Sequence, residues 1–398
     1  MNRLLFVDDE PGILEALKNS LRKQRGRWDM VFVASGAAAL QEMEKAPFDL
    51  VVSDMRMPQM DGAELLRRVK ERYPATARMV LSGQAEQSEI LRALPVTHQF
   101  LSKPCDPEQL LSVIDRTCGV YSLLRKGPAQ DVIGALDQLP SLPRSYTDLK
   151  RAMEKPQPDI AEVTAIVQND PAMCIKILQL VNSSYFGLAR PMSSIRQAVT
   201  YLGLELLKAL ALSAHIFSTM ESACLRGVCL DQLQQHSVRM ARMMRRFITD
   251  PRQSEEAFTT GLVHDVGKIL LALSFGKRYE SVSERVRSEG LACHEIEEEL
   301  LGVTHAEVGA YLLGIWGLPF PVVEAVAFHH RPSAFAAGEG ATLLAALHVA
   351  DTLCDGPCDG RAAGVGALDR AFIERSGCAA ELPRWRAIVA DEVAGRIA

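Results

Sequence analysis

The chain contains 398 residues, of which 48% are hydrophobic and 23% are charged, with a formal net charge of −5. This length exceeds what one ordinary hydrophobic core holds, so we expect two domains, and the acidic balance argues against a general nucleic-acid-binding surface. No apolar run approaches the ~18 residues of a membrane span, and the apolar start at Leu4–Val7 is too short for a signal peptide. We therefore expect a cytoplasmic protein that does not span a membrane.

The first 120 residues alternate short apolar runs with longer amphipathic segments. Strands are predicted over Leu4–Val7, Met30–Val33, Leu50–Val52, Met79–Leu81 and Phe100–Leu101. The segments between them have helical spacing, as in the run of leucines that follows Pro11. Five such strand–helix units predict a doubly wound, parallel five-stranded α/β sheet over residues 1–120.

The pattern changes after this region. Gly127-Pro128 marks a break, so we expect residues 121–137 to link two domains. Beyond it helical signals dominate: Asp170-Pro171 is typical of a helix start, and Thr304-x-x-Glu307 has the form of a capping box. These signals predict an all-α domain over residues 138–333, with residues 334–398 forming a helical extension packed on it.

Polar residues follow the predicted strands of the first domain. Asp8 and Asp9 end the first strand, Asp54 ends the third, Ser82 ends the fourth, and Lys103 follows the fifth. Ligands of open α/β sheets bind at this edge, and clustered carboxylates need a cation such as Mg²⁺ to offset their repulsion. The lysine can hold the oxygens of an incoming phosphoryl group. Capping of strand ends explains a single aspartate, but not this ordered set.

These residues belong to motifs that closely resemble the receiver family of two-component response regulators. The motifs are Val7-Asp8-Asp9-Glu10, Ser53-Asp54-Met55-Arg56-Met57-Pro58-x-Met60-Asp61-Gly62, Ser82-Gly83 and Lys103-Pro104. The resemblance implies a flavodoxin-like fold, a histidine kinase as partner and, for some members, a homodimer. It also implies the site roles: Asp54 accepts the phosphoryl group, Lys103 contacts it, Ser82 is the switch hydroxyl, and Asp8, Asp9, Asp54 and the Arg56 main-chain carbonyl hold Mg²⁺. Phe100 occupies the aromatic switch position, although burial as core of the last strand explains it equally well.

The second domain resembles the HDOD family, the output domain related to HD hydrolases, over residues 139–331. The motifs are Leu139-Pro140-x-Leu142-Pro143, Asp170-Pro171-Ala172, Leu180-Val181-Asn182-Ser183-Ser184 and Ile195-x-x-Ala198-Val199-x-x-Leu202-Gly203. The resemblance implies a helical signalling module without demonstrated catalysis. We therefore expect a phosphorylation-gated switch that acts on an unidentified downstream protein.

Several histidines and aspartates of the second domain lie on apolar helix faces, which predicts that they converge in its core. They are His236, His264, Asp265, His305, His329, His330 and Asp351. A buried carboxylate is costly unless paired or metal-bound, and a cluster of imidazoles and carboxylates suits a divalent transition metal. Any one of these histidines alone is explained as a satisfied core residue. Together they occur in the order used by HD phosphohydrolases and cyclic-di-GMP phosphodiesterases.

This order leaves an alternative function open: a receiver-gated, metal-dependent phosphohydrolase that acts on a nucleotide phosphoester, with Lys268 near the phosphate. The sequence after His330 reads Arg331-Pro332-Ser333-Ala334 and lacks the Gly-Tyr-Pro motif, which argues against cyclic-di-GMP as the substrate.

A third interpretation, nucleic-acid binding, rests on Arg239, Arg242, Arg245 and Arg246, which share much of one predicted helix flank. A solvated polar face explains these arginines equally well, and the sequence shows no helix-turn-helix. We expect no direct DNA binding.

Overall fold

The computed structural model describes most of the chain. The described residues are 2–82, 96–103, 108, 110–111, 113–115, 117, 132, 140–141, 143–153, 155, 158–182, 188, 191–212, 218–219, 224–225, 227–335, 340–354 and 368–394. The chain divides into two compact units. The first contains Met1–Gln138 with the short segments Gln179–Pro191 and Gly314–Gly317, and the second contains Leu139–Leu178, Met192–Leu313 and Leu318–Ala398.

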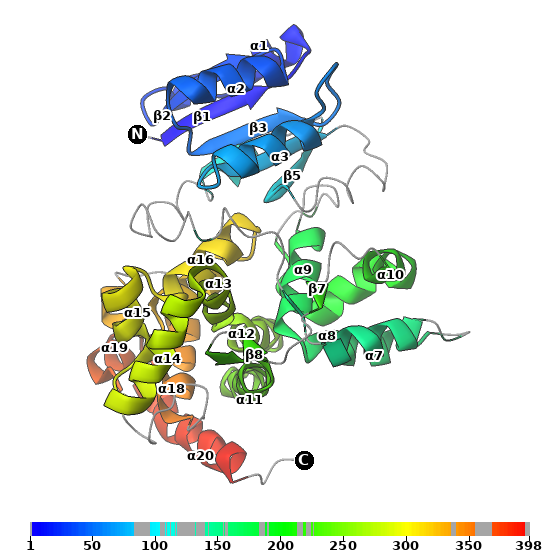
Figure 1. The fold of residues 1–398 in the computed structure, drawn as a ribbon. Coiled ribbons are helices and arrows are strands. Elements are labelled where there is room, and N and C mark those ends of the chain that lie inside the picture. The colour runs from blue at the N-terminus through cyan, green and yellow to red at the C-terminus, as the bar shows by residue number, and fades with distance from the viewer. Residues whose placement is uncertain are drawn as a thin grey trace. The chain divides into compact units, whose positions relative to one another are not determined.

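The first unit is built on a parallel sheet of five strands (Figure 1). The strands are β1 (Asn2–Val7), β2 (Trp28–Val33), β3 (Leu50–Asp54), β4 (Ala77–Ser82) and β5 (Gln99–Ser102), in the order β2-β1-β3-β4-β5. The helices described between them are α1 (Pro11–Ser20), α2 (Gly36–Lys45) and α3 (Gly62–Arg72), with a 3-10 turn at Arg22–Gln24. The predicted doubly wound, five-stranded α/β fold is confirmed, and every predicted strand lies inside an observed one.

Local sequence explains where these helices begin. Pro11 opens α1, where its fixed φ suits the first helical turn and no backbone donor is lost. The side chain of Ser35 accepts a hydrogen bond from the main-chain N–H of Ala38 at 3.2 Å and caps α2. Asp61 caps α3 in the same way, through the N–H of Glu64 at 2.8 Å.

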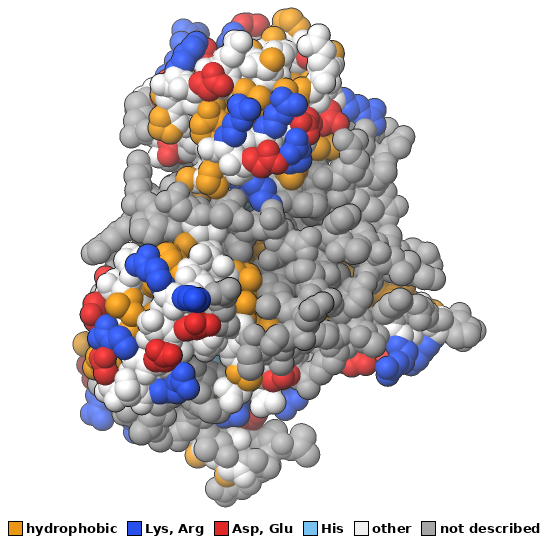
Figure 2. Space-filling view, in the orientation of Figure 1, with side chains coloured by type: hydrophobic (Ala, Val, Ile, Leu, Met, Phe, Trp, Pro, Cys, Tyr) orange, Lys and Arg blue, Asp and Glu red, His pale blue; other side chains and the backbone are white. Residues whose placement is uncertain are grey.

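The visible surface of the first unit carries interspersed basic and acidic side chains (Figure 2). On α3 these charges pair with one another: Glu64 contacts Arg67 at 2.9 Å and Arg68 at 2.7 Å. Such exposed pairs add little stability.

The second unit is mostly helical, as predicted. Its helices are α7 (Pro143–Met153), α8 (Ile160–Gln168), α9 (Pro171–Val181), α10 (Ile195–Leu212), α11 (Leu230–Phe247), α12 (Pro251–Val263), α13 (Val266–Phe275), α14 (Lys277–Glu289), α15 (Cys293–Leu301), α16 (His305–Ile315), α17 (Phe320–Phe328), α18 (Ala341–Leu353), α19 (Arg370–Arg375) and α20 (Leu382–Val393). Two short strand pairs accompany them: β6 (Pro140–Ser141) with β7 (Ser218–Thr219), and β8 (Cys224–Leu225) with β9 (Val228–Cys229). Single 3-10 turns lie at Pro332–Ala334 and Ala379–Glu381.

Both predicted helix starts of this unit form. Asp170 accepts from the N–H of Met173 at 3.1 Å, and α9 begins at Pro171. At α16 the hydroxyl of Thr304 accepts from the N–H of Glu307 at 3.2 Å, and the Glu307 carboxylate accepts from the N–H of Thr304 at 2.9 Å. This reciprocal capping box fixes where α16 begins, and therefore places the residue that opens it.

The helices after residue 334 pack on the same core. Helix α18 contacts α11 and α17, and α20 contacts α11 and α18. The indole of Trp385 stacks on Phe247 with ring centroids 5.1 Å apart and donates its N–H to the Phe247 carbonyl at 3.2 Å. These contacts anchor the last described helix to the end of α11.

The continuous run Pro251–Phe275, which spans α12 and α13, is long and apolar enough to cross a membrane by length and composition alone. However, 83% of its apolar window is buried inside the structure. A core helix of a globular protein has the same properties.

Candidate functional site

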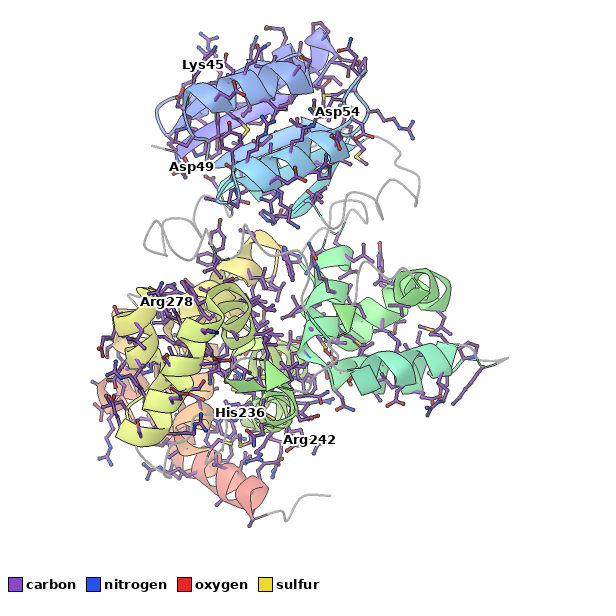
Figure 3. The ribbon with its side chains drawn as sticks, in the orientation of Figure 1. Lys45, Asp49, Asp54, His236, Arg242 and Arg278 are labelled. Atoms are coloured by element: carbon purple, nitrogen blue, oxygen red, sulfur yellow. The ribbon has the colours of Figure 1, made fainter. Side chains whose placement is uncertain are left out.

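The first cluster lies at the carboxyl edge of the sheet. Val7 and Ser53 are register partners of the parallel pair β1 and β3, so the residues that follow them, Asp8 and Asp54, are neighbours. Both carboxylates are buried, with 1% and 6% of their surface exposed. The Lys103 ammonium lies between them, donating to Asp8 Oδ2 at 2.6 Å and to Asp54 Oδ1. Figure 3 shows Asp54 at the end of its strand.

Main-chain donors hold the other oxygens of these two carboxylates. The N–H of Glu10 donates to Asp8 Oδ1 at 3.0 Å, and the N–H of Arg56 donates to Asp54 Oδ2 at 2.7 Å. Burial nevertheless raises the pKa of Asp54, and this effect outweighs the opposing influence of Lys103. Burial disfavours the charge of Lys103 as well, but hydrogen bonds to Asp54 and Asp8 outweigh it and raise the lysine pKa. Two buried carboxylates thus share one ammonium.

The loop after Asp54 folds tightly against it. Gly62 opens α3 so close to β3 that a Cβ at this position would lie 2.1 Å from the Asp54 carbonyl oxygen. Gln59 has a φ of 67°, in the left-handed region that non-glycine residues rarely adopt. Asp61-Gly62 ends one of the receiver-like motifs in the sequence. The structure gives the physical reason for the glycine, because only glycine permits this close approach of α3 to β3.

The cluster fits a divalent cation with oxygen ligands. Asp8 and Asp54 face one another, and Asp9 follows at the same strand end, half-buried. Carboxylate oxygens are the ligands that Mg²⁺ prefers, and one ammonium leaves these acids an excess of negative charge. The structure therefore brings together Asp8, Asp54 and Lys103 of the predicted set. The side chains of Ser82 and Phe100 lie outside the described part of the chain, so their predicted switch roles stay predictions.

The second cluster lies inside the helical unit. Its members come from separate elements: His236 from α11, His264 and Asp265 from the junction of α12 and α13, His305 from the start of α16, His329 and His330 from the end of α17, and Asp351 from α18. Figure 3 shows His236 on α11 within the helical unit. Their ligand atoms gather into two groups of three, namely His236, His264 and Asp351, and His305, His329 and His330. Six of the seven predicted residues therefore fall into these two groups.

Asp265 lies between the two groups. Its Oδ2 atom is 3.4 Å from His264 Nε2 and 3.8 Å from His236 Nε2. Its Oδ1 atom is 3.3 Å from His305 Nε2. The carboxylate of Asp351 stands 3.8 Å from His236 Nε2 and 3.9 Å from His264 Nε2 through its Oδ1 atom. One carboxylate thus presents an oxygen to each group.

Hydrogen bonds fix the orientation of three imidazoles. The Nδ1 atom of His264 lies 2.8 Å from the Gly261 carbonyl, that of His329 lies 2.7 Å from the Val326 carbonyl, and that of His305 lies 2.6 Å from Glu297 Oε2. Because carbonyl and carboxylate oxygens accept, each Nδ1 carries a proton, and the neutral rings of His264 and His329 therefore direct a lone pair from Nε2. The Nε2 atoms of His264 and His329 are buried and have no hydrogen-bond partner among the described residues.

The electrostatics of the cluster favour neutral rings around a charged carboxylate. Burial lowers the pKa of His264 and holds the pKa values of His329 and His330 well below their usual range. Burial opposes the charge of Asp265, but His264 and Lys268 outweigh it and hold the Asp265 pKa well below normal. The Lys268 ammonium donates to Asp265 Oδ2 at 2.8 Å. Neutral imidazole and ionised carboxylate are the forms that bind a metal.

Glu297 belongs to this cluster, although the sequence did not predict it. Its carboxylate is fully buried and accepts from the Tyr279 hydroxyl at 2.9 Å and from both the main-chain N–H and the ring of His305. Burial lowers the pKa of His305, but the Glu297 carboxylate outweighs burial, so the His305 pKa is raised. In sequence Glu297 lies among other glutamates, at 295, 298 and 299, and no pattern distinguishes it from them. Only the tertiary structure shows that it orients His305.

Two glycines set the spacing of this cluster. A Cβ on Gly267 would lie 1.9 Å from the His305 carbonyl oxygen, so α13 approaches α16 only because this residue lacks a side chain. A Cβ on Gly261 would lie 2.8 Å from the Met240 carbonyl oxygen on α11. These close approaches bring His264 and His305 near their partners.

Comparisons with known proteins agree with both halves of the chain. A family model of the response regulator receiver domain matches residues 4–115, and a model of the HDOD domain matches residues 139–332. An uncharacterized protein of Treponema pallidum is 26% identical over 203 residues, which are 51% of this chain and 40% of that protein. The transcriptional regulatory protein GlrR of Escherichia coli is 34% identical over 132 residues, which are 32% of this chain and 28% of GlrR. The chain thus spans less than half the length of these curated relatives.

Solved structures also resemble this fold. A virulence factor from Campylobacter jejuni superposes with a TM-score of 0.52 at 19% identity, covering 71% of this chain and 97% of that one, and shares the fold. The MmoQ response regulator from Methylococcus capsulatus gives a TM-score of 0.47 at 25% identity over 63% of this chain and 98% of its own.

The parallel sheet, its acidic edge and the receiver match define the N-terminal unit as a response regulator receiver domain. The helical unit matches the HDOD domain over most of its length. The chain therefore combines a response regulator receiver domain with an HDOD domain, as its two sequence resemblances predicted.

Proposed function

We propose that Asp54 accepts a phosphoryl group from a histidine kinase and that this modification controls the HDOD domain. The observation that carries the proposal is the Lys103 ammonium shared between the buried carboxylates of Asp8 and Asp54. An ammonium at this point can neutralise phosphoryl oxygens, and the oxygen of Asp54 that it contacts is the nucleophile.

Mg²⁺ completes the receiver site in this proposal, held by Asp8, Asp9, Asp54 and the main-chain carbonyl of Arg56. When bound, it supplies charge stabilisation to the phosphoryl group. The chain itself supplies the rest: Lys103 binds phosphoryl oxygens, and the N–H of Arg56 holds the second oxygen of Asp54 in place. The proposal also includes the predicted domain boundaries, a receiver homodimer, a cytoplasmic location and a downstream protein partner.

The experiment is phosphorylation of the full chain by a small phosphodonor, acetyl phosphate, with Mg²⁺, read by intact-protein mass spectrometry. The unmodified chain gains one phosphoryl group, Asp54→Asn gains none, and Asp29→Asn, which changes an aspartate that is 55% exposed on β2, keeps the gain. Phosphorylation that persists in Asp54→Asn would contradict the assignment.

We propose, second, that the helical cluster binds two divalent transition-metal ions that share Asp265. His236, His264 and Asp351 supply one set of ligands, and His305, His329 and His330 supply the other. The oriented, buried Nε2 atoms of His264 and His329 favour this function, because a buried acceptor without a donor is costly and a metal ion satisfies it. In this arrangement α18, which lies beyond the HDOD match, contributes a ligand.

A metal pair of this kind can activate water against a phosphoester, so the alternative of a gated phosphohydrolase is tested with it. Metal content and phosphodiesterase activity are measured on chain purified with Mn²⁺, for the unmodified protein, Asp265→Asn, and a control, Glu299→Gln, whose carboxylate is 60% exposed and lies outside both groups of three. Bound metal without turnover would support a metal-stabilised signalling domain. Absence of metal from the unmodified protein would refute the proposal.

A further inference from the structure

One buried histidine of the helical unit contacts the helical cluster without belonging to either group of three. His348 lies on α18, three residues before Asp351, and 5% of its surface is exposed. Its Nδ1 atom is 2.8 Å from the main-chain carbonyl oxygen of His329. The ring therefore contacts the backbone that carries two of the proposed ligands, His329 and His330.

Hydrogen bonds at both ring nitrogens fix the tautomer of His348. A carbonyl oxygen only accepts, so Nδ1 carries the proton that it donates to His329. The main-chain N–H of Asp369 lies 3.0 Å from Nε2, which accepts this second bond with its lone pair. Burial lowers the pKa of His348 and so favours the neutral ring that this arrangement needs. Because both nitrogens are engaged, His348 supports the cluster in this arrangement without binding a metal ion itself.

The residue that His348 contacts is held at two points. His329 follows the last residue of α17, where main-chain carbonyls lack partners within the helix, and His348 supplies a donor to the His329 carbonyl. The His329 ring is held separately, through Nδ1, by the Val326 carbonyl at 2.7 Å. His348 thus fixes the backbone from which the ring projects. That backbone leads directly to His330, whose Nε2 atom is 2.9 Å from His305 Nε2.

Asp369 connects His348 to the part of the chain that follows the HDOD match, which ends at residue 332. Asp369 is the N-cap of α19, and its carboxylate accepts from the main-chain N–H of Phe372 at 2.9 Å and from the hydroxyl of Ser333. Its own main-chain N–H donates to His348. Residues of α18 and α19, beyond the HDOD match, therefore contribute to the position of His329.

We propose that His348 is a positioning residue for the ligand group His305, His329 and His330, because by holding the His329 carbonyl it sets the direction of the His329 and His330 rings. This inference rests on the proposed metal-binding function. Groups that orient metal ligands change metal affinity by about 10–100-fold when they are removed. Glu297 orients His305 in the same group, and His348 extends this support to the other two ligands.

Two amide variants separate the two contacts of His348. The side-chain N–H of His348→Asn can reach the His329 carbonyl as Nδ1 does, whereas His348→Gln places its amide near the position of Nε2, where it can accept from Asp369. Co²⁺ affinity and the visible spectrum of bound Co²⁺ are measured on the full chain. We expect His348→Gln to weaken Co²⁺ binding about 10-fold and to alter the spectrum, and His348→Asn to keep both.

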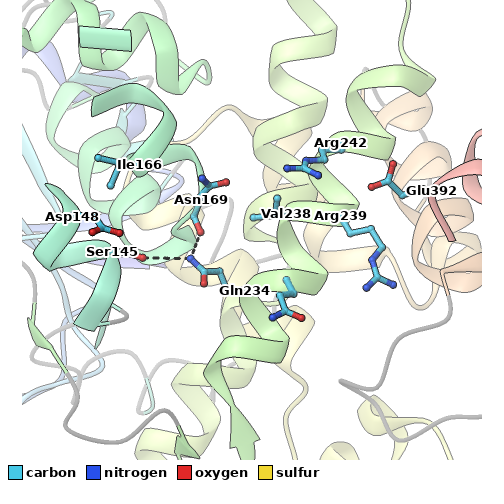
Figure 4. A pocket seen from close by; sticks show the side chains of 10 residues that line it. Ser145, Asp148, Ile166, Asn169, Gln234, Val238, Arg239, Arg242 and Glu392 are labelled. Atoms are coloured by element: carbon cyan, nitrogen blue, oxygen red, sulfur yellow. Dashed lines mark hydrogen bonds between the residues drawn. The ribbon is translucent and has the colours of Figure 1, made fainter. Parts of the chain in front are cut away.

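The control removes a buried hydrogen bond elsewhere in the helical unit. Ser145→Ala deletes the hydroxyl on α7 that accepts from Gln234 on α11 at 3.4 Å, drawn as a dashed line in Figure 4. Ser145 belongs to neither group of three, so this variant should leave the Co²⁺ affinity and spectrum unchanged. A loss equal to that of His348→Gln would show that lower stability alone weakens metal binding, and would overturn the positioning role.

A measurement without metal keeps this inference distinct from the metal proposal. In EDTA, the ring nitrogen shifts of chain labelled with ¹⁵N-histidine report the surroundings and tautomers of His329 and His330. We expect His348→Gln to shift these signals and His348→Asn to preserve them. If the unmodified chain binds no metal, the metal proposal fails, and these shifts still decide whether His348 positions the two rings.

Unchanged shifts in a folded His348→Gln chain, or equal changes in both amide variants, would overturn the inference. If circular dichroism shows that His348→Gln is unfolded, His348→Leu, which also lacks the donor to His329, decides in its place.

Discussion

The receiver edge and the helical cluster both place a lysine on a buried aspartate, yet they differ in every other ligand. Lys103 meets carboxylates alone, at the ends of neighbouring strands, whereas Lys268 meets an aspartate surrounded by imidazoles inside a helical core. Oxygen-only sets suit Mg²⁺ and phosphoryl chemistry, and imidazole-rich sets suit transition metals. A similar Lys–Asp contact therefore suits different chemistry in the two surroundings.

Exposure separates the two sites further. Lys103 keeps 19% of its side chain exposed, while Lys268 keeps 5% and His264, His305 and His329 keep none. A receiver must reach a kinase, so its acceptor has to be near solvent. The helical cluster is enclosed within its own domain.

The largest expected effect distinguishes the proposed metal site of the helical domain from that of the receiver. Asp265→Asn should lower the affinity of the helical domain for Mn²⁺ by at least about 100-fold, because both proposed ions lose a shared charged ligand. Asp8→Asn should leave that affinity unchanged while weakening Mg²⁺ binding by the receiver. Equilibrium dialysis with both variants measures this, and equal losses in both would break the distinction between the sites.

Removing the close approach of α13 and α16 should have the next largest effect. Gly267→Ala places a Cβ that would lie 1.9 Å from the His305 carbonyl, so the helices must move apart. We expect a loss of about 2–3 kcal/mol in the free energy of unfolding, as for overpacked cores. Urea unfolding measures it against Gly12→Ala, where an added Cβ meets nothing within 4 Å. A stability loss confined to the control would contradict the packing argument.

The orienting role of Glu297 gives a smaller effect. Glu297→Gln should weaken metal binding by about 10-fold, since the amide holds the His305 ring less firmly than the carboxylate. The control is Glu299→Gln, whose carboxylate is 60% exposed and pairs with Arg285. Visible spectra of the Co²⁺-loaded domain report the ligand field, and an unchanged spectrum and affinity would show that Glu297 serves packing alone.

The smallest effect concerns Asp54 without metal. Its pKa is raised by burial above the ordinary value of 3.8, so the folded receiver binds this proton more tightly than the unfolded chain does. Stability therefore falls as pH rises from below 4 through the folded pKa, and Asp54→Asn should stabilise the metal-free receiver at pH 7. Urea unfolding in EDTA at pH 4 and pH 7 checks the sign, since the gain should shrink at the lower pH.

Sequence alone predicted much of the fold and of the receiver site. Apolar runs at strand length placed all five strands, and Pro11, Asp170 and Thr304 marked helix starts, because those signals act on the local backbone. Acidic residues at strand ends converged as expected, since parallel strands bring their carboxyl ends to one edge.

Tertiary structure decided the rest. Ordering of the histidines along the chain did not show that Asp265 faces both groups, because that depends on how five separated helices cross. Glu297 and Gly267 act through contacts with His305 that no local pattern encodes. Trp385 reaches Phe247 only because the last described helix packs against the end of α11, which brings together residues 138 apart in sequence.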